Sequence, residues 1–403
     1  MKKLFTLMVC MGAAVPMFAA TPNVVDLAKK AKTTAEARNY IQQAIHDPQL
    51  SQQAETYFVA GKIELDAYND GIKNKMINPD DPSAQIDVMG KELIDAYNYF
   101  LKALPLDSLP NEKGQIKPRY SKDIVKNLKS YQNDFFSVGA DYYNAQKYYP
   151  EAYEGFVIYG DIPSLIPEIQ KEATYNPEQI ATAFFNAGLA ANQGGNMEAS
   201  ADAFKKARLA GYPKPEATIY EIACWQTITQ QDENRSTEAQ NKIMEAAQFG
   251  IDNFGIQEPI FINNLINSMI NNGEMEESIA TLNNLIAANP DVANLYGLRG
   301  YVYDRMEKDD LSEADYRKAS SLPTADFETL KNTANKLYRV GAAKLNDIEG
   351  SAADTNNARQ DIKQNYFMAA KELAQRADQM QPGDSYVQNL LESIDYALTT
   401  FFN

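Results

Sequence analysis

The side chains that most often carry acid-base or metal chemistry are scarce in this chain of 403 residues. It has one histidine, His46, which cannot build a multi-histidine metal site. A Ser-His-Asp triad would need His46 and a nucleophile, but no G-x-S-x-G motif is present. His46 precedes Asp47-Pro48 at a predicted helix end, where a cation complements the helix dipole. We therefore expect His46 to be structural.

The other reactive groups also favour structural roles. Cys224 stands among apolar helix residues beside Trp225, which is typical of a buried thiol. Acidic pairs such as Asp309-Asp310 fall at turns or helix starts, where capping explains them. Gly194-Gly195 lacks the Gly-Lys-Ser/Thr of a phosphate loop. We expect no catalytic residue, no metal and no cofactor, although paired carboxylates of the glycosidase kind stay open.

The elements that position these residues are predicted to be helices. From Thr21 onward, helix-period segments of about 12 to 20 residues alternate with Pro, Gly, Asn and Asp, and no alternating strand pattern is convincing. Most of the 24 tyrosines and 17 phenylalanines fall at interior positions of these helices, so we expect core rather than carbohydrate stacking. The predicted fold class is all-α.

A recurring pattern spaces small and large residues along one helix face. The clearest segment is 177–213, with Gly188 on one helix, a Gly-Gly turn, and Phe204 on the next. The segment 259–290 repeats it with Ile262 and Ile266, and Tyr296 and Gly300 follow these two residues by 34 positions. A fixed period of 34 indicates stacked helix pairs, since one hairpin cannot bury its apolar face alone.

These residues resemble the tetratricopeptide repeat family, without a tryptophan at its usual first position. The resemblance implies a right-handed α-solenoid of about seven hairpins over residues 21–382, preceded by a helix near 33–45 and capped by a helix in 383–403. The looser pairs place Gly61 with Phe100, Ala140 with Phe156, Ala223 with Ile243, and Gly341 with Ala370. Polar insertions interrupt the spacing at 69–87, 107–120, 160–176, 230–236 and 347–357.

The resemblance also implies a partner surface, because the first helix of each tetratricopeptide pair lines a concave groove. In that register the predicted binding residues are Lys62, Asn144, Asn186, Asn192, Trp225, Asn263, Asn267, Asn271, Tyr301 and Arg305, and Asp141 shares their face. Asparagine offers both a donor and an acceptor, which suits an extended peptide backbone. The family's lysine-asparagine carboxylate clamp is not reproduced, so a peptide C-terminus is not favoured.

The first 20 residues predict export. Lys2 and Lys3 precede an apolar run from Leu4 to Val15, and Ala19-Ala20 follows. This run is too short to span a bilayer, for which about 20 apolar residues are needed. We expect an exported protein of the periplasm or cell surface without a transmembrane segment. Cys10 is a weak candidate for lipid attachment because Val9 before it is not small.

The charge balance narrows the partners. The formal net charge is -16, which repels phosphate backbones and makes nucleic acid an unfavourable partner. We expect a non-catalytic interaction scaffold that holds a protein or peptide. Two alternatives stay open: a glycan-binding protein of an uptake system, and a helical-repeat hydrolase that uses paired carboxylates.

Overall fold

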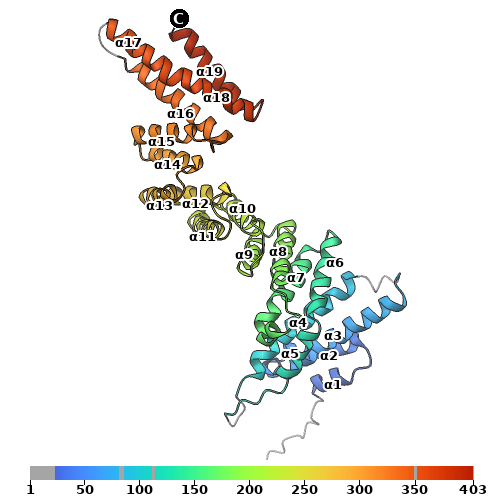
Figure 1. The fold of residues 1–403 in the computed structure, drawn as a ribbon. Coiled ribbons are helices and arrows are strands. Elements are labelled where there is room, and N and C mark those ends of the chain that lie inside the picture. Colours follow the sequence, from blue (N-terminus) through green and yellow to red (C-terminus); the bar gives the residue numbers. More distant parts are fainter. Residues whose placement is uncertain (1–22, 81–85, 111–113, 349–351, 403) are drawn as a thin grey trace, which may run out of the picture. The chain divides into compact units, whose positions relative to one another are not determined.

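The computed structural model of the chain describes residues 23–80, 86–110, 114–348 and 352–402 (Figure 1). The predicted signal segment, residues 1–20, lies outside these ranges. Throughout the described residues the secondary structure is helical, with no strand beyond one isolated bridge between Pro110 and Ile116. None of the helices in these ranges has the length and apolar character to cross a membrane.

The packing divides the chain into two compact units with their boundary between Tyr212 and Pro213. The first unit contains α1 (Val24–Lys30), α2 (Thr34–His46), α3 (Ala54–Ile77), α4 (Ile86–Asp107), α5 (Ser121–Ser130), α6 (Gln132–Asn144), α7 (Tyr149–Leu165), α8 (Pro177–Gln193) and α9 (Met197–Leu209). The second contains α10 (Glu216–Gln231), α11 (Ser236–Phe254), α12 (Pro259–Asn271), α13 (Met275–Ala288), α14 (Ala293–Arg305), α15 (Asp309–Ser321), α16 (Phe327–Asn346), α17 (Ala352–Ile362), α18 (Ala369–Met380) and α19 (Ser385–Phe401).

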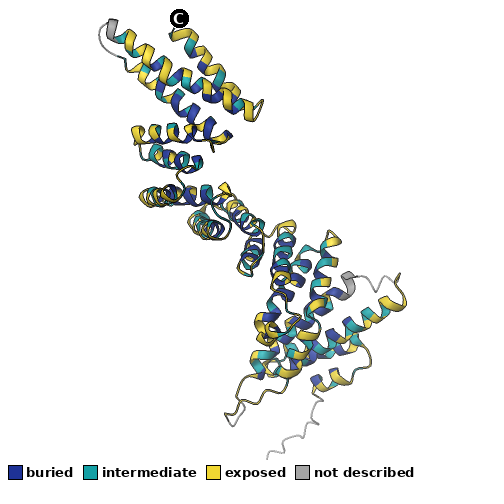
Figure 2. Cartoon of the chain, viewed as in Figure 1, coloured by how far each residue is buried: buried dark blue, intermediate teal, exposed yellow. Residues whose placement is uncertain are grey.

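Seven helix pairs account for most of both units, as the repeat pattern predicted. They are α3 with α4, α6 with α7, α8 with α9, α10 with α11, α12 with α13, α14 with α15, and α16 with α18. In Figure 2 the buried residues lie mainly where neighbouring helices meet. The predicted flanking helices are present as α2 and α19, and α1 packs against α2.

The small residues of the pattern are the points of close approach. A Cβ added at Gly188 would lie 2.6 Å from the ring of Phe204, and one at Gly61 would lie 2.5 Å from Phe100. Interiors are packed without spare volume, so these positions require glycine. The predicted pairing of Gly188 with Phe204 and of Gly61 with Phe100 is confirmed.

In α10 the predicted register is wrong, and in α6 the most buried face lies beside the predicted one. On α6 this face carries Phe135, Val138, Gly139 and Tyr142. Ala140 on the predicted face is half-buried and packs against the cluster that contains Phe156, so the predicted pairing of Ala140 with Phe156 is present. Gly139 contacts Phe156, because the backbones of Gly139 and Gly155 approach closely.

On α10 the predicted core residue Ala223 is exposed, and so is Tyr220 one turn before it. The buried face of this helix instead contains Thr218, Glu221, Ile222 and Cys224. Two polar residues therefore occupy positions that a hydrophobic pattern assigns to solvent. Burial of Cys224, with 2% of its surface exposed, is as predicted.

In the described residues, four of the five polar insertions contain helix, and the insertion at 107–120 does not continue as helix after Asp107. Residues 81–85, 111–113 and 349–351 of these insertions lie outside the described ranges. Residues 69–77 extend α3, residues 160–165 extend α7, and the 3-10 helix η3 (Pro167–Lys171) follows α7. The insertion at 230–236 contains the 3-10 helix η4 (Glu233–Arg235). Helix α17 occupies part of the insertion at 347–357, and the π-helix η5 (Lys363–Met368) joins α17 to α18.

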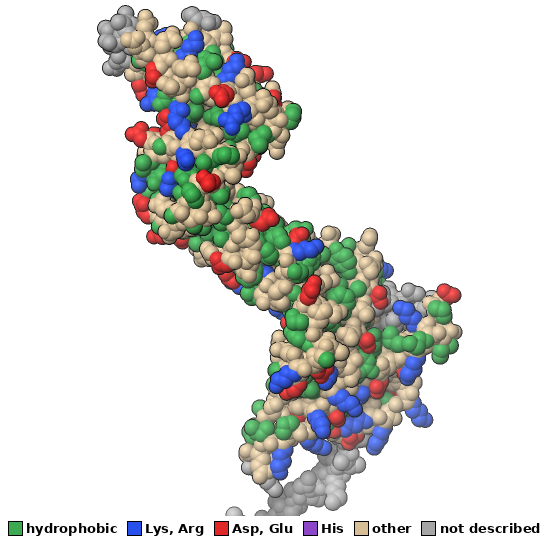
Figure 3. All heavy atoms as spheres, in the orientation of Figure 1, with side chains coloured by type: hydrophobic (Ala, Val, Ile, Leu, Met, Phe, Trp, Pro, Cys, Tyr) green, Lys and Arg blue, Asp and Glu red, His purple; other side chains and the backbone are tan. Residues whose placement is uncertain are grey.

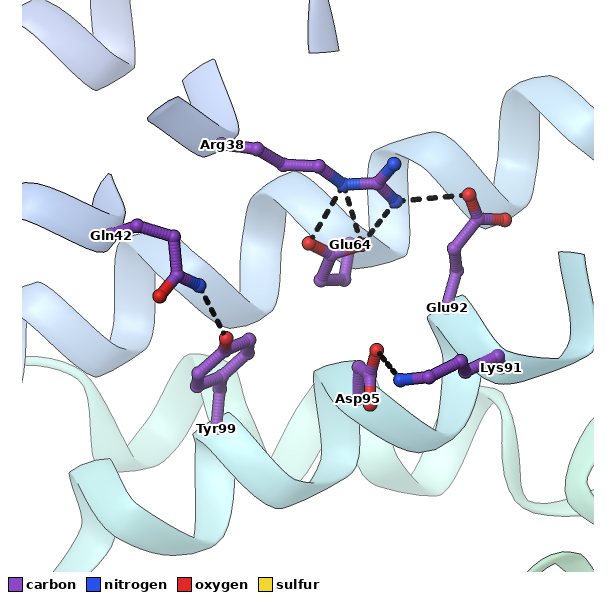
Figure 4. Close-up of polar contacts among 7 residues, drawn as sticks. All are labelled: Arg38, Gln42, Glu64, Lys91, Glu92, Asp95 and Tyr99. Atoms are coloured by element: carbon purple, nitrogen blue, oxygen red, sulfur yellow. Dashed lines mark hydrogen bonds and ion pairs between the residues drawn. The ribbon is translucent and has the colours of Figure 1, made fainter. Parts of the chain in front are cut away.

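A partly buried ion cluster fixes α2 to the third and fourth helices. Arg38 on α2 donates hydrogen bonds to Glu64 on α3, with 2.9 Å between Nε and Oε1, and to Glu92 on α4, with 2.9 Å between Nη2 and Oε1 (Figure 4). The hydrogen bonds to Glu64 are the main cause that raises the pKa of the Arg38 guanidinium, and they outweigh the opposing effect of burial. Beside this cluster, Gln42 on α2 donates to the hydroxyl of Tyr99 on α4 over 2.9 Å (Figure 4).

Candidate binding groove

The first helices of three successive pairs enclose a polar hollow in the second unit. Helices α12, α14 and α16 begin at Pro259, Ala293 and Phe327, and these starts recur with the period of 34 found in the sequence. The hollow has a volume of about 410 Å³ and we call it the amide groove. Its lining residues are Asn263, Asn267, Asn294, Gly297, Leu298, Tyr301, Asp304, Tyr316, Glu328, Thr329, Asn332, Asn335, Lys336 and Arg339.

Helical period places these side chains on one face of each helix. On α16, Glu328, Asn332, Asn335 and Arg339 follow one another at intervals of four, three and four residues, so they form a single stripe. Five of the groove's side chains are asparagines. Side-chain amides are the dominant chemistry of this surface.

One amide pair joins two of the helices. The Nδ2 of Asn294 on α14 donates to the Oδ1 of Asn263 on α12 over 3.0 Å. Asn267, Asn332 and Asn335 make no side-chain hydrogen bond to any residue that the structure describes. Their donors and acceptors therefore face the hollow without a protein partner.

Most charges of the groove are neutralised by neighbours. Lys336 has 4% of its surface exposed and donates hydrogen bonds to Asp304 and, over 2.9 Å, to Asp309. Burial alone would lower the pKa of Lys336, but the hydrogen bonds to these two carboxylates outweigh burial and raise it. Glu328 accepts a hydrogen bond from Lys331 over 2.7 Å. Arg339 has no carboxylate within ion-pair distance among the described residues.

The floor of the groove is held by the pair α14 and α15. Arg299 makes two hydrogen bonds of 2.7 Å to the carboxylate of Asp315, a bidentate contact that fixes both helices. Tyr316 lies buried next to this pair, and burial raises the pKa of its hydroxyl. This contact fixes the floor, while the side-chain amides of Asn267, Asn332 and Asn335 have no hydrogen-bond partner among the described residues.

The structure brings together three of the ten predicted binding residues: Asn263, Asn267 and Tyr301 line the groove. Asn271 and Arg305 follow Asn267 and Tyr301 by four residues and are the last residues of α12 and α14. At 1.5 Å per residue, four residues displace a side chain by about 6 Å. These two residues are exposed and do not line the groove.

The other five predicted residues lie elsewhere. Lys62 lines a separate hollow of about 460 Å³ beside α1 and α2, 3.7 Å from Asp66. Asn144 and Asn192 are exposed on α6 and α8, and Asn186 is half-buried on α8. Trp225 packs against the apolar core of the second unit, with the guanidinium of Arg235 5.8 Å from its ring. No common site in the structure joins these five.

None of the predicted binding residues lies on α16, although the period of 34 identifies the residues of this helix that line the groove. Asn335 and Arg339 follow Tyr301 and Arg305 by 34 positions, so the register of α14 extends to the next helix. Asn332 follows Leu298 by the same interval. The insertion at 347–357 interrupts the spacing between the two helices of this pair, so the period was less evident there.

In the described part of the chain, no group of three or more His, Cys, Asp or Glu side chains is placed to hold a metal ion. Acidic and basic side chains are interspersed on the face drawn in Figure 3, with no extended field of one sign. The local chemistry of the amide groove is therefore neutral and polar, with one available guanidinium.

No family model and no curated protein matches the chain. Solved structures do match. A thermophilic TPR protein of Thermus thermophilus is 15% identical and covers 54% of this chain and 99% of its own, with a TM-score of 0.32. A TPR repeats protein of Bacteroides fragilis NCTC 9343 is 17% identical, covering 66% and 98%, with a TM-score of 0.31.

A tetratricopeptide repeat protein of Parabacteroides merdae ATCC 43184 is 11% identical and covers 66% of this chain and 99% of its own, with a TM-score of 0.32. The chain itself has helix pairs closed by contacts between glycines and aromatic rings, and its first helices recur with a period of 34. By its own packing and period, it is an all-α protein of the tetratricopeptide type.

Proposed function

We propose that this protein is a binding scaffold that holds an extended segment of another protein in the amide groove. The observation that carries the proposal is a glycine in the middle of α14. A Cβ added at Gly297 would have no heavy atom within 4 Å, although Gly297 lines the groove. Packing therefore gives no reason for a glycine at this position. Glycine inside a helix also destabilises the helix by about 1 kcal/mol relative to alanine.

The neighbouring glycine shows the contrast. A Cβ at Gly300, three residues along α14, would lie 3.2 Å from the carbonyl oxygen of Ser312 and 3.2 Å from the Tyr316 ring. The fold therefore explains Gly300 and leaves Gly297 unexplained. Glycine is used where a ligand or another backbone approaches closely, and this role supports a partner seated over Gly297.

The amides suit a peptide backbone as that partner. An extended segment presents an N–H and a C=O at each residue, and Asn267, Asn332 and Asn335 each offer a donor and an acceptor. Arg339 at the end of the stripe suits an acidic side chain of the same segment. The groove thus favours a chain with one carboxylate among neutral residues.

Binding accounts for the groove better than hydrolysis does. Two carboxylates line it, but Asp304 accepts a hydrogen bond from Lys336 and Glu328 accepts one from Lys331. A general acid and base need to face one substrate bond, and these two are engaged by lysines. We further propose that the scaffold works in the bacterial envelope, on the basis of the export pattern in residues 1–20.

A groove-filling substitution tests the proposal. Unstructured dodecapeptides would be selected against the full chain by phage display, and the strongest would be synthesised and titrated by calorimetry. Gly297→Trp places an indole in the groove where the added Cβ meets no atom, so we expect at least about a tenfold loss of affinity. Circular dichroism should show unchanged helicity.

The matched control is Ala280→Trp, which adds the same side chain at an exposed position of α13, outside the groove. It should bind the peptide as the unmodified chain does. Equal affinity of Gly297→Trp and the unmodified chain would refute the groove as the binding surface.

A further inference from the structure

A second hollow, in the first unit, is built by a segment that interrupts the repeat. Helix α8 begins at Pro177 and α6 at Gln132, an interval of 45 positions rather than 34. Part of the additional segment is buried, including Ile162, Ile166 and Ile169. They form the end of α7, the 3-10 helix η3 and the segment 172–176, and these enclose one side of a hollow of about 380 Å³ against α6.

The inserted segment is fixed in place by side chains. Gln170 donates a hydrogen bond to the carbonyl of Pro163 over 2.9 Å, and Lys129 at the end of α5 forms an ion pair with Glu172. The Oδ1 of Asn176 caps α8 by accepting from the backbone of Glu178 over 3.0 Å. The hollow is therefore preformed, as small-molecule sites usually are.

The inner surface combines aromatic rings with buried aliphatic residues. The Phe136 ring lines the hollow and packs edge-on against Tyr159, with 5.3 Å between ring centroids. The nearby Ile169 and Ile180 are buried, and the half-buried Tyr175 also lines the hollow. Two aromatic side chains from different elements thus offer apolar contact area to one ligand.

The rim is polar and uncharged. The side chains of Asn133, Thr174, Tyr175 and Gln179 line the hollow without a hydrogen bond to any described residue. Two charged residues also line the hollow, Lys129 and Glu172, and they pair with each other. A phosphate or carboxylate ligand would find no unpaired cation here, and a purely apolar ligand would make no use of the amide donors and acceptors.

A neutral molecule with many hydroxyls satisfies both conditions. Each hydroxyl donates and accepts, as do the side-chain amides of Asn133 and Gln179. The C–H face of a sugar ring is apolar and matches an aromatic surface. The volume also lies in the range of about 300 to 1,000 Å³ that is usual for ligand pockets.

We propose that this hollow binds a neutral saccharide, which packs on Phe136 and Tyr175 and hydrogen-bonds Asn133 and Gln179. The site is independent of the amide groove, because every residue that lines it belongs to the first unit. One chain can then hold a polypeptide segment and a glycan at separate places.

An array of neutral α-glucans, β-glucans, mannans and N-acetylglucosamine oligomers, probed with the labelled full chain, tests the proposal. We expect retention on at least one of these oligosaccharides, and calorimetry with it should give one site per chain. Tyr175→Ala and Asn133→Ala should each lower the affinity, the first by at least about tenfold because it removes the stacking surface.

Two control variants test whether saccharide binding is specific to this hollow. Tyr396→Ala removes a tyrosine that is 68% exposed on α19 and should leave saccharide affinity unchanged. Gly297→Trp, which fills the amide groove, should also leave it unchanged, so failure of one proposal is distinguishable from failure of the other. Absence of binding across the array, or full affinity in both Tyr175→Ala and Asn133→Ala, would overturn the proposal.

Discussion

The side chains of Asn294 and Asn263 form an amide-amide hydrogen bond of 3.0 Å between two successive first helices. This bond uses the acceptor of Asn263 and a donor of Asn294, so these two residues position α12 and α14 relative to each other. Asn267 and Asn335, by contrast, keep both amide groups free of described residues. The groove therefore contains structural amides and amides available to a partner.

This division predicts which asparagines control affinity. Asn267→Ala combined with Asn335→Ala should weaken binding of the selected peptide by about tenfold, since each lost hydrogen bond contributes about 0.5 to 1.5 kcal/mol. Asn271→Ala should have no effect, because Asn271 does not line the hollow. Titration of the peptide into each variant measures both. A loss in Asn271→Ala as large as that in the double variant would contradict the proposed extent of the groove.

The two glycines of α14 predict opposite effects on stability. Gly300→Leu must displace Ser312 and Tyr316, so it should lower the free energy of unfolding by about 1 to 3 kcal/mol. Gly297→Leu meets no atom and gains helix propensity, so it should leave stability unchanged or raise it by up to about 1 kcal/mol. Urea unfolding followed by circular dichroism compares them. Equal destabilisation by both would show that the register of α14 is wrong.

Sequence reasoning placed most helices correctly because the spacing of small and large residues follows the helical period. It missed the most buried face of α6 for a definite reason. That helix has two adjacent stripes of similar character, one with Phe135 and Gly139 and one with Phe136 and Ala140. Periodicity cannot choose between them, and the choice is made by Gly155 on α7, which the backbone of Phe135 and Gly139 approaches closely. Tertiary contact therefore sets the register.

The candidate sites were harder to predict than the helices, because they depend on tertiary arrangement that a single sequence does not show. Repetition with a period of 34 was sufficient to place Asn267 and Tyr301 in one groove. The hollow beside Phe136 could not be anticipated, since its far side comes from an insertion of irregular length whose path the period does not specify. A burial pattern also cannot show that Asn271, in phase with Asn267, does not line the hollow.

A partly buried carboxylate, that of Asp161, predicts a pH-dependent stability. Burial raises the pKa of Asp161 on α7, and its neighbour Asp202 adds to this, against the opposing effect of Lys206 at 3.3 Å. The folded state therefore binds this proton more tightly than the unfolded state. Its contribution is present below the unfolded pKa of about 3.9 and is lost as the pH rises through the folded pKa.

Asp161→Asn should therefore unfold at a higher temperature than the unmodified chain at pH 7, and the difference should shrink at pH 4. The position of Asp161 near the C-terminal end of α7, where a negative charge opposes the helix dipole, acts in the same direction. Scanning calorimetry at both pH values measures the effect. Asp70→Asn, at a side chain that is 71% exposed, is the control and should change neither temperature. The prediction is wrong if the unfolding temperature of Asp161→Asn, relative to the unmodified chain, is lower at pH 7 than at pH 4.

The cluster of Arg38, Glu64 and Glu92 predicts a stability coupling between α2 and α3. Arg38→Met leaves Glu64, whose side chain is 9% exposed, without its guanidinium, so it should cost about 1 to 3 kcal/mol. Combining Arg38→Met with Glu64→Leu removes the unpaired buried charge as well, and the double variant should be more stable than the sum of the single losses predicts. Urea midpoints of the unmodified chain, the two single variants and the double variant give the coupling.

Lys73→Ala is the control. It breaks an exposed pair with Asp70 and should lower stability by less than about 1 kcal/mol. Strict additivity of the Arg38 and Glu64 losses would mean that the two side chains do not stabilise each other, and that apolar contacts alone hold α2 against α3.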